Sequence, residues 1–441
     1  MEILIQALQL ILSLSILVIV HEFGHFIAAK AFKTRVEKFY LFFNPWFSIF
    51  KFKYGETEYG LGWLPLGGYV KISGMIDESM DKEQMSKPPE PWEFRIKPSW
   101  QRLIIMLGGV IMNIVLAVCI YIVMLLIWGD EYLPTSEVKF GIRVDSLAME
   151  MGLRNGDKIL TVDNEYIENF AKIKEKIILD YARSIQVDRE GEKIDIPIPQ
   201  EFLGKLLKHK SPDFISYRIP FEVEKFEKGS AGQKAGIMVD DKIIALNNKP
   251  TLYFIDFYNE IQKHKNEEVT VGIVRNIDTL SFNVVVPEAG KLGIHPKRED
   301  HYFTFSKVKY SFFSAIPEGI NRAYNGVGNY LKSMKLLFHP EVEVSESVGG
   351  FITIGSIFPV QWNWQLFWTL TAFLSIMLAI INIFPIPALD GGHVMFLLYE
   401  IITRRKPNDK FMEYAQITGM VILLALLVFV NGNDIVRLFR N

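Results

Sequence analysis

The sequence predicts a polytopic α-helical membrane protein that also carries water-facing domains of mixed α and β structure. Its 441 residues have a mean hydropathy of +0.17, which is high for a soluble protein, yet 22% of them are charged, too many for a bundle buried wholly in a membrane. The single cysteine, Cys119, excludes an intramolecular disulfide. A net charge of −2 gives no support for binding nucleic acid. We therefore exclude a soluble cytosolic enzyme and expect a few spanning helices joined to globular parts.

Four segments are apolar and long enough to cross about 30 Å of hydrocarbon, which takes about 20 helical residues. They run approximately over residues 3–29, 103–128, 364–384 and 414–430. The first segment lacks the basic start and the small-residue cleavage site of a signal peptide, and it continues into charged sequence. We therefore expect it to be a spanning helix and not a cleaved leader.

Basic residues in the short loops predict the orientation of these four spans. Neither Lys nor Arg precedes the first span, whereas the loops after the first and third spans are both rich in them. These residues are Lys30, Lys33, Arg35, Lys38, Lys51, Lys53, Lys97 and Arg102 in one loop, and Arg404, Arg405, Lys406 and Lys410 in the other. Both loops are expected in the cytoplasm. The stretch 129–361 and the tail after Asn431 are expected outside, since long domains are translocated largely regardless of charge.

The predicted external stretch contains an internal repeat of one small domain. Residues 147–164 read LAMEMGLRNGDKILTVDN, and residues 231–248 read AGQKAGIMVDDKIIALNN. In both copies a small residue, a Gly, a short turn, an Asp and an alternating strand follow one another, and this pattern resembles PDZ domains. We expect two such α+β domains in tandem, at 129–205 and 206–290. They either hold an extended peptide at a sheet edge or act as spacers or size filters that bind nothing tightly.

A histidine motif lies at the predicted cytoplasmic end of the first span, where residues 21–25 read HEFGH. In a helix, residues i and i+4 share a face, so His21 and His25 point the same way. Two imidazoles at this spacing can bind one Zn²⁺, with Glu22 beside them as general base. The alternative is that these groups only mark the helix end and reach toward the interface. Three ionisable groups within five residues of a membrane segment favour a functional site.

A third metal ligand is needed, because a catalytic zinc usually takes three protein ligands and a water. Asp390 is the best candidate, within the segment 382–392 that reads NIFPIPALDGG after the third span. Two prolines break the helix there, at the same predicted side of the membrane as the HEFGH motif. The alternative for Asp390 is an N-cap of the next helix, and we interpret His393 as a first-turn residue of that helix. The remaining histidines are expected to be ordinary surface or core groups: His209, His264, His295, His301 and His339.

The two motifs, their order and the tandem repeat between the second and third spans resemble the site-2 protease family of zinc intramembrane metalloproteases, and within it the bacterial type with two PDZ domains. The resemblance covers essentially the whole chain. It implies Zn²⁺ held by His21, His25 and Asp390 with Glu22 as the catalytic residue. Two departures leave the local backbone open, because Gly108-Gly109 stands where the family more often has Gly-Pro, and residues 348–351 likewise lack a proline.

The resemblance also implies substrate-binding elements. Residues 59–71, which read YGLGWLPLGGYVK, look like the family's membrane-associated β-hairpin. The segment Gly67, Gly68 and Tyr69 would then offer an edge for strand addition. Asn382 matches the family's substrate-contacting asparagine, and its alternative role is an interhelical hydrogen bond. Residues 310–338 resemble the amphipathic segment that follows the second PDZ unit near the outer interface.

The resulting prediction is a zinc metalloendopeptidase of the bacterial plasma (inner) membrane, with its active site toward the cytoplasm. Its expected partners are the bilayer, single-span substrates such as a pre-trimmed anti-sigma factor or remnant signal peptides, and possible peptide ligands of the PDZ-like domains. The expected boundaries are 1–32 for the first span with HExxH, 33–102 for the cytoplasmic loop with the β-hairpin, 103–128 for the second span, 129–205 and 206–290 for the PDZ-like domains, 291–361 for the amphipathic segment, 362–402 for the third span with the LDGG motif, and 403–441 for the last loop, span and tail.

Two other functions compete with this one. The first is a non-enzymatic tandem-PDZ membrane receptor or adaptor whose metal site is vestigial or structural, and the intact Glu22 and Asp390 argue against it. The second is a transporter with broken helices, which is disfavoured by only four spans and by the lack of a recognisable inverted repeat.

Overall fold

The structure is a computed structural model that describes residues 2–65, 67–75, 88–209, 214–340, 342 and 348–440. The chain divides into two compact units. One unit contains the described residues up to Gly129, Lys309–Phe338 and those from Val348 onward, and the other contains the described part of Asp130–Val308 with His339 and Val342. Parts of several predicted segments lie outside the described residues: 66 in the predicted hairpin, 76–87 in the first loop, 210–213 in the second repeat, and 341 and 343–347 in the amphipathic stretch.

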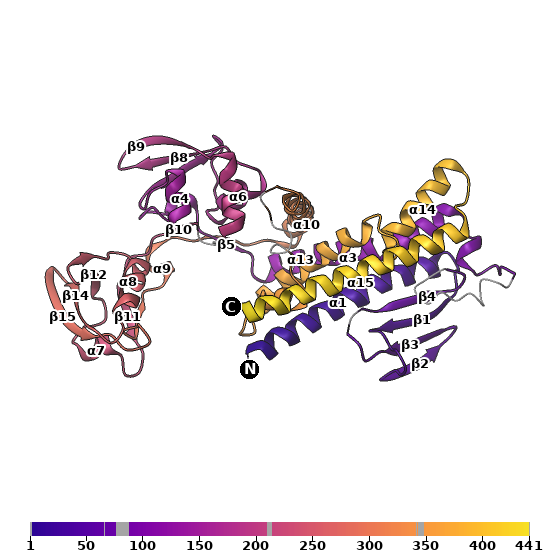
Figure 1. The fold of residues 1–441 in the computed structure, drawn as a ribbon, viewed down its shortest axis with the longest axis horizontal. Helices are drawn as coiled ribbons and strands as arrows, with labels where there is room; N and C mark the ends of the chain where they lie inside the picture. The colour runs from indigo at the N-terminus through magenta and orange to yellow at the C-terminus, as the bar shows by residue number, and fades with distance from the viewer. Residues whose placement is uncertain are drawn as a thin grey trace. The chain divides into compact units, whose positions relative to one another are not determined.

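Four helices of the first unit are long and apolar enough to cross a membrane, which confirms the four predicted spans. They are α1 (Glu2–Ala31), α3 (Ser99–Ile127), α13 (Trp364–Ile383) and α15 (Asp409–Arg440), and Figure 1 shows them side by side. Their residues are apolar on nearly every face, as expected for helices that meet lipid on one side and neighbouring helices on the other. The described chain is therefore a polytopic membrane protein with a mixed helix-and-sheet remainder.

Close helix crossings hold the bundle together around α3. A side chain at Gly24 of α1 would collide with the backbone of Gly108 on α3, so these two glycines allow the helices to approach. The helix α3 runs unbroken through Gly108 and Gly109, which answers the question left by the missing proline. The serine hydroxyl of Ser375 on α13 donates to the carbonyl of Asn113 on α3 at 2.7 Å.

Shorter helices complete this unit. The helix α12 (Phe351–Ser356) follows the proline-free segment, and its first amides donate to side chains of α15, namely Phe351 N to Asn431 (3.1 Å) and Thr353 N to Asp434 (2.9 Å). The helix α14 (Asp390–Thr403) begins after the two prolines. The helix α10 (Phe312–Leu336) covers most of the predicted amphipathic segment, with Gly319 packed against Ile122 of α3.

A four-stranded sheet lies between α1 and α3 in the sequence, and it corrects the predicted hairpin. The strand order is β2-β3-β1-β4, with β1 parallel to β3 and antiparallel to β4. The hairpin is formed by β2 and β3, whereas residues 59–71 contain the end of β3 and most of β4, which lie on opposite sides of β1. Local sequence pattern cannot reveal this insertion of β1, because it depends on a pairing between distant segments. The strands are β1 (Val36–Leu41), β2 (Phe50–Tyr54), β3 (Thr57–Leu61) and β4 (Tyr69–Ile72).

The second unit contains two copies of one arrangement, in which a short helix, a strand, a second helix and a β-hairpin follow one another. Each copy has its own apolar core, and the first core also includes Phe214, Ile215 and Phe303 from beyond the predicted boundary at residue 205. The first copy contains α4 (Ser146–Met151), β7 (Lys158–Val162), α5 (Ala171–Leu179), β8 (Ser184–Arg189) and β9 (Glu192–Pro197). The second contains α7 (Ala231–Lys234), β12 (Lys242–Leu246), α8 (Phe254–Ile261), β14 (Glu268–Arg275) and β15 (Asp278–Val285).

Further short elements surround these copies. They are β5 (Asp130–Tyr132), β6 (Ile142–Val144), α6 (Gln200–His209), β10 (Ile215–Tyr217), β11 (Val223–Phe226), β13 (Lys249–Pro250), β16 (Ile294–Pro296), α9 (Glu299–Tyr302) and β17 (Ser306–Val308). Among them, β5 pairs with β17, β6 with β10, and β11 with β16.

The sequence repeat is matched by a repeated ion pair. Asp157 accepts two hydrogen bonds from Arg189, both at 2.8 Å, and Asp241 accepts two from Arg275, also at 2.8 Å. Both aspartates have side chains only 1% exposed, so the planar guanidinium neutralises a buried carboxylate in each copy. The turn before each aspartate keeps a positive φ as well, although Asp240 (φ 69°) stands where the first copy has Gly156 (φ 100°).

Candidate metal centre

Two histidines of α1 and one aspartate of α14 meet inside the first unit. The Nε2 atoms of His21 and His25 lie 3.3 Å apart, and Oδ2 of Asp390 lies 3.1 Å and 3.3 Å from them. Both imidazoles are buried, as expected for a site within the bundle. Among the residues that the structure describes, these three form the one group of three or more His, Cys, Asp or Glu side chains close enough to share a metal ion. The structure thus brings together the three residues that the sequence selected as ligands.

The ring of His25 is oriented by a hydrogen bond to α3. Its Nδ1 lies 2.8 Å from the carbonyl oxygen of Ile105 on α3. A carbonyl can only accept, so Nδ1 carries the proton and Nε2 keeps its lone pair in the neutral imidazole. Metal-bound histidines are commonly oriented by such an outer hydrogen bond.

Asn113 of α3 orients the other ring in the same way. Its side-chain amide lies 3.2 Å from Nδ1 of His21, while its Oδ1 is buried with no hydrogen-bond partner among the described residues. The two ends of an amide are nearly indistinguishable in shape. With the amide turned over, Oδ1 accepts from Nδ1 of His21, and Nε2 of His21 faces the centre with its lone pair. Sequence reasoning missed this residue, although an asparagine in an apolar span was a signal for it.

The donor set fits a zinc ion. Oδ2 of Asp390 is buried and has no hydrogen-bond partner among the described residues, although it faces both imidazoles. A carboxylate oxygen left in this state is costly unless a cation is present. Two imidazole nitrogens and one carboxylate oxygen with space for a water are a common catalytic zinc set.

Close packing around the rings makes the site dependent on glycine. A side chain at Gly109 of α3 would lie 2.5 Å from a carbon of the His21 ring and 2.6 Å from Nε2 of His25. Because glycine has no side chain, α3 can lie directly against both imidazoles. This is the position at which the sequence departs from the family pattern.

A cavity of about 670 Å³ opens beside these residues. Its wall includes Glu22, which places the predicted general base in the same space as the ligand atoms. Gly67, Gly68 and Tyr69, next to or within β4, also line it, as does Asn382 of α13. The candidate substrate-binding residues therefore face the same cavity as the candidate ligands, and so does His393, one turn after Asp390.

The candidate substrate-binding residues make different contacts within the protein. Nδ2 of Asn382 lies 3.3 Å from Nε2 of His21, so its contact in this structure is an interhelical one, the alternative considered from the sequence. A side chain at Gly68 would lie 2.6 Å from the carbonyl of Tyr40 and 2.7 Å from Val18. The hydroxyl of Tyr69 donates to Asn44 at 3.0 Å. Burial raises the pKa of Tyr69 to about 12, so this hydroxyl remains a donor at neutral pH.

The remaining histidines whose side chains are described belong to the second unit: His264, His295, His301 and His339. His264 pairs with Glu267 at 2.7 Å, and His295 lies 3.4 Å from Glu227. These contacts are typical of surface groups. The side chain of His209 lies outside the described residues.

The fold and the site together define a membrane-embedded metalloprotease, and comparison with known proteins agrees. A model of Peptidase family M50 matches residues 9–426, so the chain belongs to this family of site-2 proteases. The chain is 27% identical over 460 residues to the regulator of sigma E protease of Haemophilus influenzae, covering 97% of this chain and 98% of that protein. It is 26% identical over 456 residues to the regulator of sigma-E protease RseP of Escherichia coli, covering 97% and 98%. A protein of Campylobacter jejuni that is provisionally named a zinc metalloprotease is 28% identical over 437 residues, covering 98% and 94%.

These findings establish the class of the protein. It is a zinc-dependent intramembrane metalloprotease and a multi-pass protein of the bacterial inner membrane. The predictions of a protease and of a zinc cofactor are confirmed, and the receptor and transporter alternatives are set aside.

Proposed function

We propose that the protein hydrolyses peptide bonds within transmembrane segments, that His21, His25 and Asp390 hold the zinc ion, and that Glu22 is the general base in this reaction. The observation that carries this proposal is the convergence of two Nε2 atoms and the otherwise unpartnered Oδ2 of Asp390 on one point. Each histidine has an outer partner on α3, which sets its tautomer for metal binding.

The chemistry follows from the positions of these side chains. Zinc bound there would polarise the scissile carbonyl and lower the pKa of a water. Glu22 takes the proton of the attacking water on its carboxylate and later delivers it to the leaving amine. The surrounding helices limit the access of bulk water, which strengthens the electrostatic interactions inside the cavity.

The substrate must present an extended backbone, because the peptide bonds of an intact helix are shielded by their own hydrogen bonds. Within the sheet of the described strands β4 lies at the edge, and it borders the cavity that contains Glu22. A locally unwound substrate can add to this edge as a further strand. Gly68 allows the strand to lie close to Tyr40 and Val18, and Asn382 offers a donor and an acceptor to the substrate backbone.

Two variants test these substrate contacts. Asn382→Ala is expected to reduce cleavage while leaving the zinc content normal, and unchanged cleavage would reject its substrate role. Gly68→Pro removes a backbone N–H next to β4, and a variant that cleaves normally would count against strand addition. Phe52→Ala, on the exposed outer strand β2 of the same sheet, is the matched control and is expected to cleave normally.

The two repeated copies are proposed to be PDZ-like domains outside the cytoplasm that control access to the site. Support comes from the shared helix, strand and hairpin order and from a cavity of about 190 Å³ in the second copy, bordered by Phe257 of α8 and Ile294 of β16. The proposed substrates are single-span proteins whose outer domain has already been removed, as in regulated intramembrane proteolysis. Anti-sigma factors fit this description, since two relatives are named regulators of sigma E.

The gating role predicts the result of a deletion. Removing residues 130–290 should allow cleavage of a substrate that still has its outer domain. If the shortened protein still cleaves trimmed substrate but leaves untrimmed substrate intact, the two copies do not act as a size filter.

The catalytic assignment is tested with a tagged model transmembrane substrate. Cleavage by the wild type should be abolished by a chelator and by Glu22→Gln, while elemental analysis finds zinc in the variant at the wild-type level. Cleavage that persists in Glu22→Gln would remove Glu22 from the role of base.

A further inference from the structure

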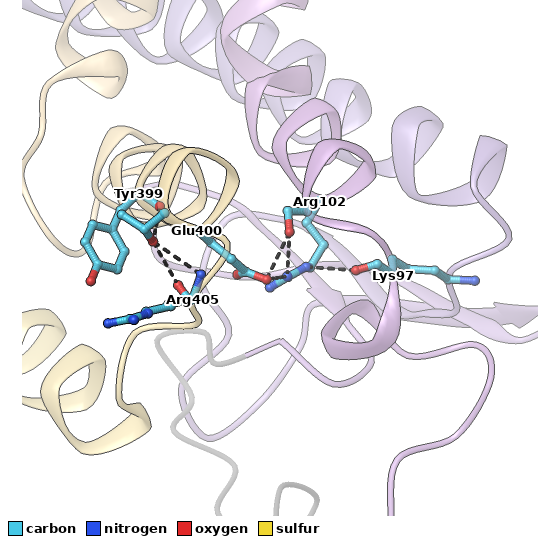
Figure 2. A network of polar contacts seen from close by, with 7 residues as sticks. Lys97, Arg102, Tyr399, Glu400 and Arg405 are labelled. Carbon is cyan, nitrogen blue, oxygen red and sulfur yellow. Dashed lines mark hydrogen bonds and ion pairs between the residues drawn. The ribbon is translucent and has the colours of Figure 1, made fainter.

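An ion pair joins α14 directly to α3. It lies at the end of both helices that is remote from His21. Nη2 of Arg102 in the first turn of α3 donates to Oε1 of Glu400 on α14 at 2.6 Å. Oγ of Ser99 donates to the same oxygen at 2.9 Å. The side chains of Arg102 and Glu400 are only 12% and 11% exposed, so this ion pair is largely shielded from water (Figure 2).

Both helices of this ion pair also serve the metal centre. The helix α14 begins with Asp390, and α3 provides the carbonyl of Ile105 and the amide of Asn113 that orient the two imidazoles. At 1.5 Å of rise per residue, Glu400 lies about 15 Å along α14 from Asp390, and Asn113 about 16 Å along α3 from Arg102. The ion pair thus joins directly two helices that also contact the same two histidines of α1, α14 through Asp390 and α3 through Ile105 and Asn113.

The segment just before α14 is irregular, so it does little to fix the direction of this helix. It follows Pro385, Pro387 and Ala388, and Ala388 has a positive φ of 83°. The glycines after Asp390 pack against this loop, since a side chain at Gly392 would lie 2.6 Å from Cα of Pro387. Apart from Asp390, Glu400 is the one acidic residue within α14, all of whose residues are described. Its ion pair therefore fixes the far end of a helix whose first residue must reach the metal.

Arg102 also connects α14 with the sheet. Its Nε donates to the carbonyl of Lys97 at 3.0 Å, and its guanidinium lies 5.9 Å from the centre of the Phe94 ring. The amide of Phe94 in turn donates to the carbonyl of Ser73, directly after β4, at 2.8 Å. Figure 2 shows Arg102 between Lys97 and Glu400, at the junction of these contacts. One arginine thus links α14 to the strand that borders the cavity.

We propose that Arg102 and Glu400 are positioning residues for catalysis: their ion pair holds α14 so that Asp390 reaches the two imidazoles, and holds that helix in register with β4. The proposal rests on the proposed role of Asp390 as a ligand. A planar, always charged guanidinium is suited to this task, because it can hold a carboxylate and a backbone carbonyl at once in fixed directions.

The test uses the full-length protein and two readouts besides cleavage: the zinc dissociation constant from competition with a chelator, and the unfolding temperature of the zinc-free protein. Arg102→Glu and Glu400→Arg should each weaken zinc binding by about threefold or more, which is less than the 10- to 100-fold known for groups that contact a metal ligand directly, because the ion pair acts through the length of α14. The double reversal Arg102→Glu with Glu400→Arg should restore most of the affinity. Glu400→Gln, which keeps the shape of the side chain, covers the case in which a reversed charge prevents folding, and it should weaken zinc binding in the same direction.

Lys263→Glu is the control, because Lys263 is exposed, pairs with Glu260 in the second unit at 3.0 Å, and the change alters the net charge equally. It should leave the zinc affinity at the wild-type value. Wild-type zinc affinity in Glu400→Gln and in both single reversals would overturn the proposal. So would a loss that matches a lower unfolding temperature and is not rescued by the double reversal. Because zinc affinity is measured without substrate, failure of the proposed cleavage reaction gives a different result: the wild type then binds zinc but cleaves nothing.

Discussion

The helices α13 and α15 are both long and apolar, but the protein holds them very differently. In the most apolar stretch of α13, 44% of the residues are buried inside the protein, against 17% for α15. Polar side chains of α13 contact α1 and α3 at three positions along the helix: Thr371 contacts Ser13, Ser375 contacts Asn113, and Asn382 contacts His21. Apolar side chains of α15 point away from the protein, among them Val421, Leu424 and Val428.

This difference separates the part of the bundle that determines the site from the part that mainly meets lipid. Hydrogen bonds between membrane helices fix their rotation as well as their distance. The contacts of α1, α3 and α13 therefore set the direction of the two histidine ligands, whereas the described residues on the outer face of α15 contribute no contact of this kind. Removing a contact that is made directly to one of the two imidazoles should affect zinc binding, whereas changes on the outer face of α15 should not.

The largest effect is expected for Gly24→Leu. The new side chain collides with the backbone of Gly108, so α1 and α3 must separate and both imidazoles lose their partners on α3. A misplacement of about 1 Å can cost about 100-fold in rate. We expect cleavage to fall at least that far, with loss of bound zinc by elemental analysis. Phe23→Leu, at the exposed neighbouring position, is the control and should behave as wild type. Normal zinc content in Gly24→Leu would contradict the account.

The next effect is expected for Asn113→Leu. This change removes the acceptor for Nδ1 of His21, so the ring loses its fixed tautomer and direction. Zinc affinity should fall by about 10- to 100-fold, measured by chelator competition. Asn113→Asp retains an acceptor and should lose less. Equal losses in both variants would show that the amide acts through packing and not through the histidine.

A smaller effect is expected for Ser375→Ala, which removes the hydrogen bond from α13 to the carbonyl of Asn113. Interhelical hydrogen bonds in membranes contribute about 0.6 kcal/mol on average and up to about 1.7 kcal/mol. The free energy of unfolding in detergent should drop within this range, with zinc affinity unchanged. Ser15→Ala serves as control, because Ser15 donates only within α1, to Ile11, among the described contacts. A drop of the same size there would assign the effect to the serine itself.

The smallest effect is expected for Leu424→Ala on the outer face of α15. This side chain is 57% exposed, so its truncation removes few contacts with the protein. The free energy of unfolding should change by less than about 0.5 kcal/mol, and the cleavage rate should stay at the wild-type value. A large loss in either measurement would show that this face packs against protein in the membrane.

The part of the site that the sequence predicted is the part fixed by local geometry. His21 and His25 share a helix face because of their spacing, and the four spans follow from length and apolar composition. The prediction of Asp390 as a ligand also depended on the side of the membrane at which its segment ends. In the structure these three side chains meet within hydrogen-bonding distance.

The parts that the sequence did not predict depend on how distant elements pack. Asn113 could be recognised as a partner of His21 only from the rotation of α3 against α1, which the structure provides. The parallel pairing of β1 with β3 joins segments that no local alternation connects, which is why residues 59–71 were wrongly predicted to be a hairpin. The ion pair of Arg102 and Glu400 likewise joins residues almost 300 positions apart.

The central claim is that Asp390 is the third zinc ligand, and zinc-edge X-ray absorption of the variant Asp390→Cys tests it most directly. In the wild type we expect only nitrogen and oxygen neighbours, at about 2.0 to 2.2 Å. In the variant a sulfur neighbour should be added at about 2.3 Å, while His393→Cys, one turn further along α14, should add none. A variant Asp390→Cys that binds zinc with an unchanged, sulfur-free spectrum would contradict the assignment of Asp390.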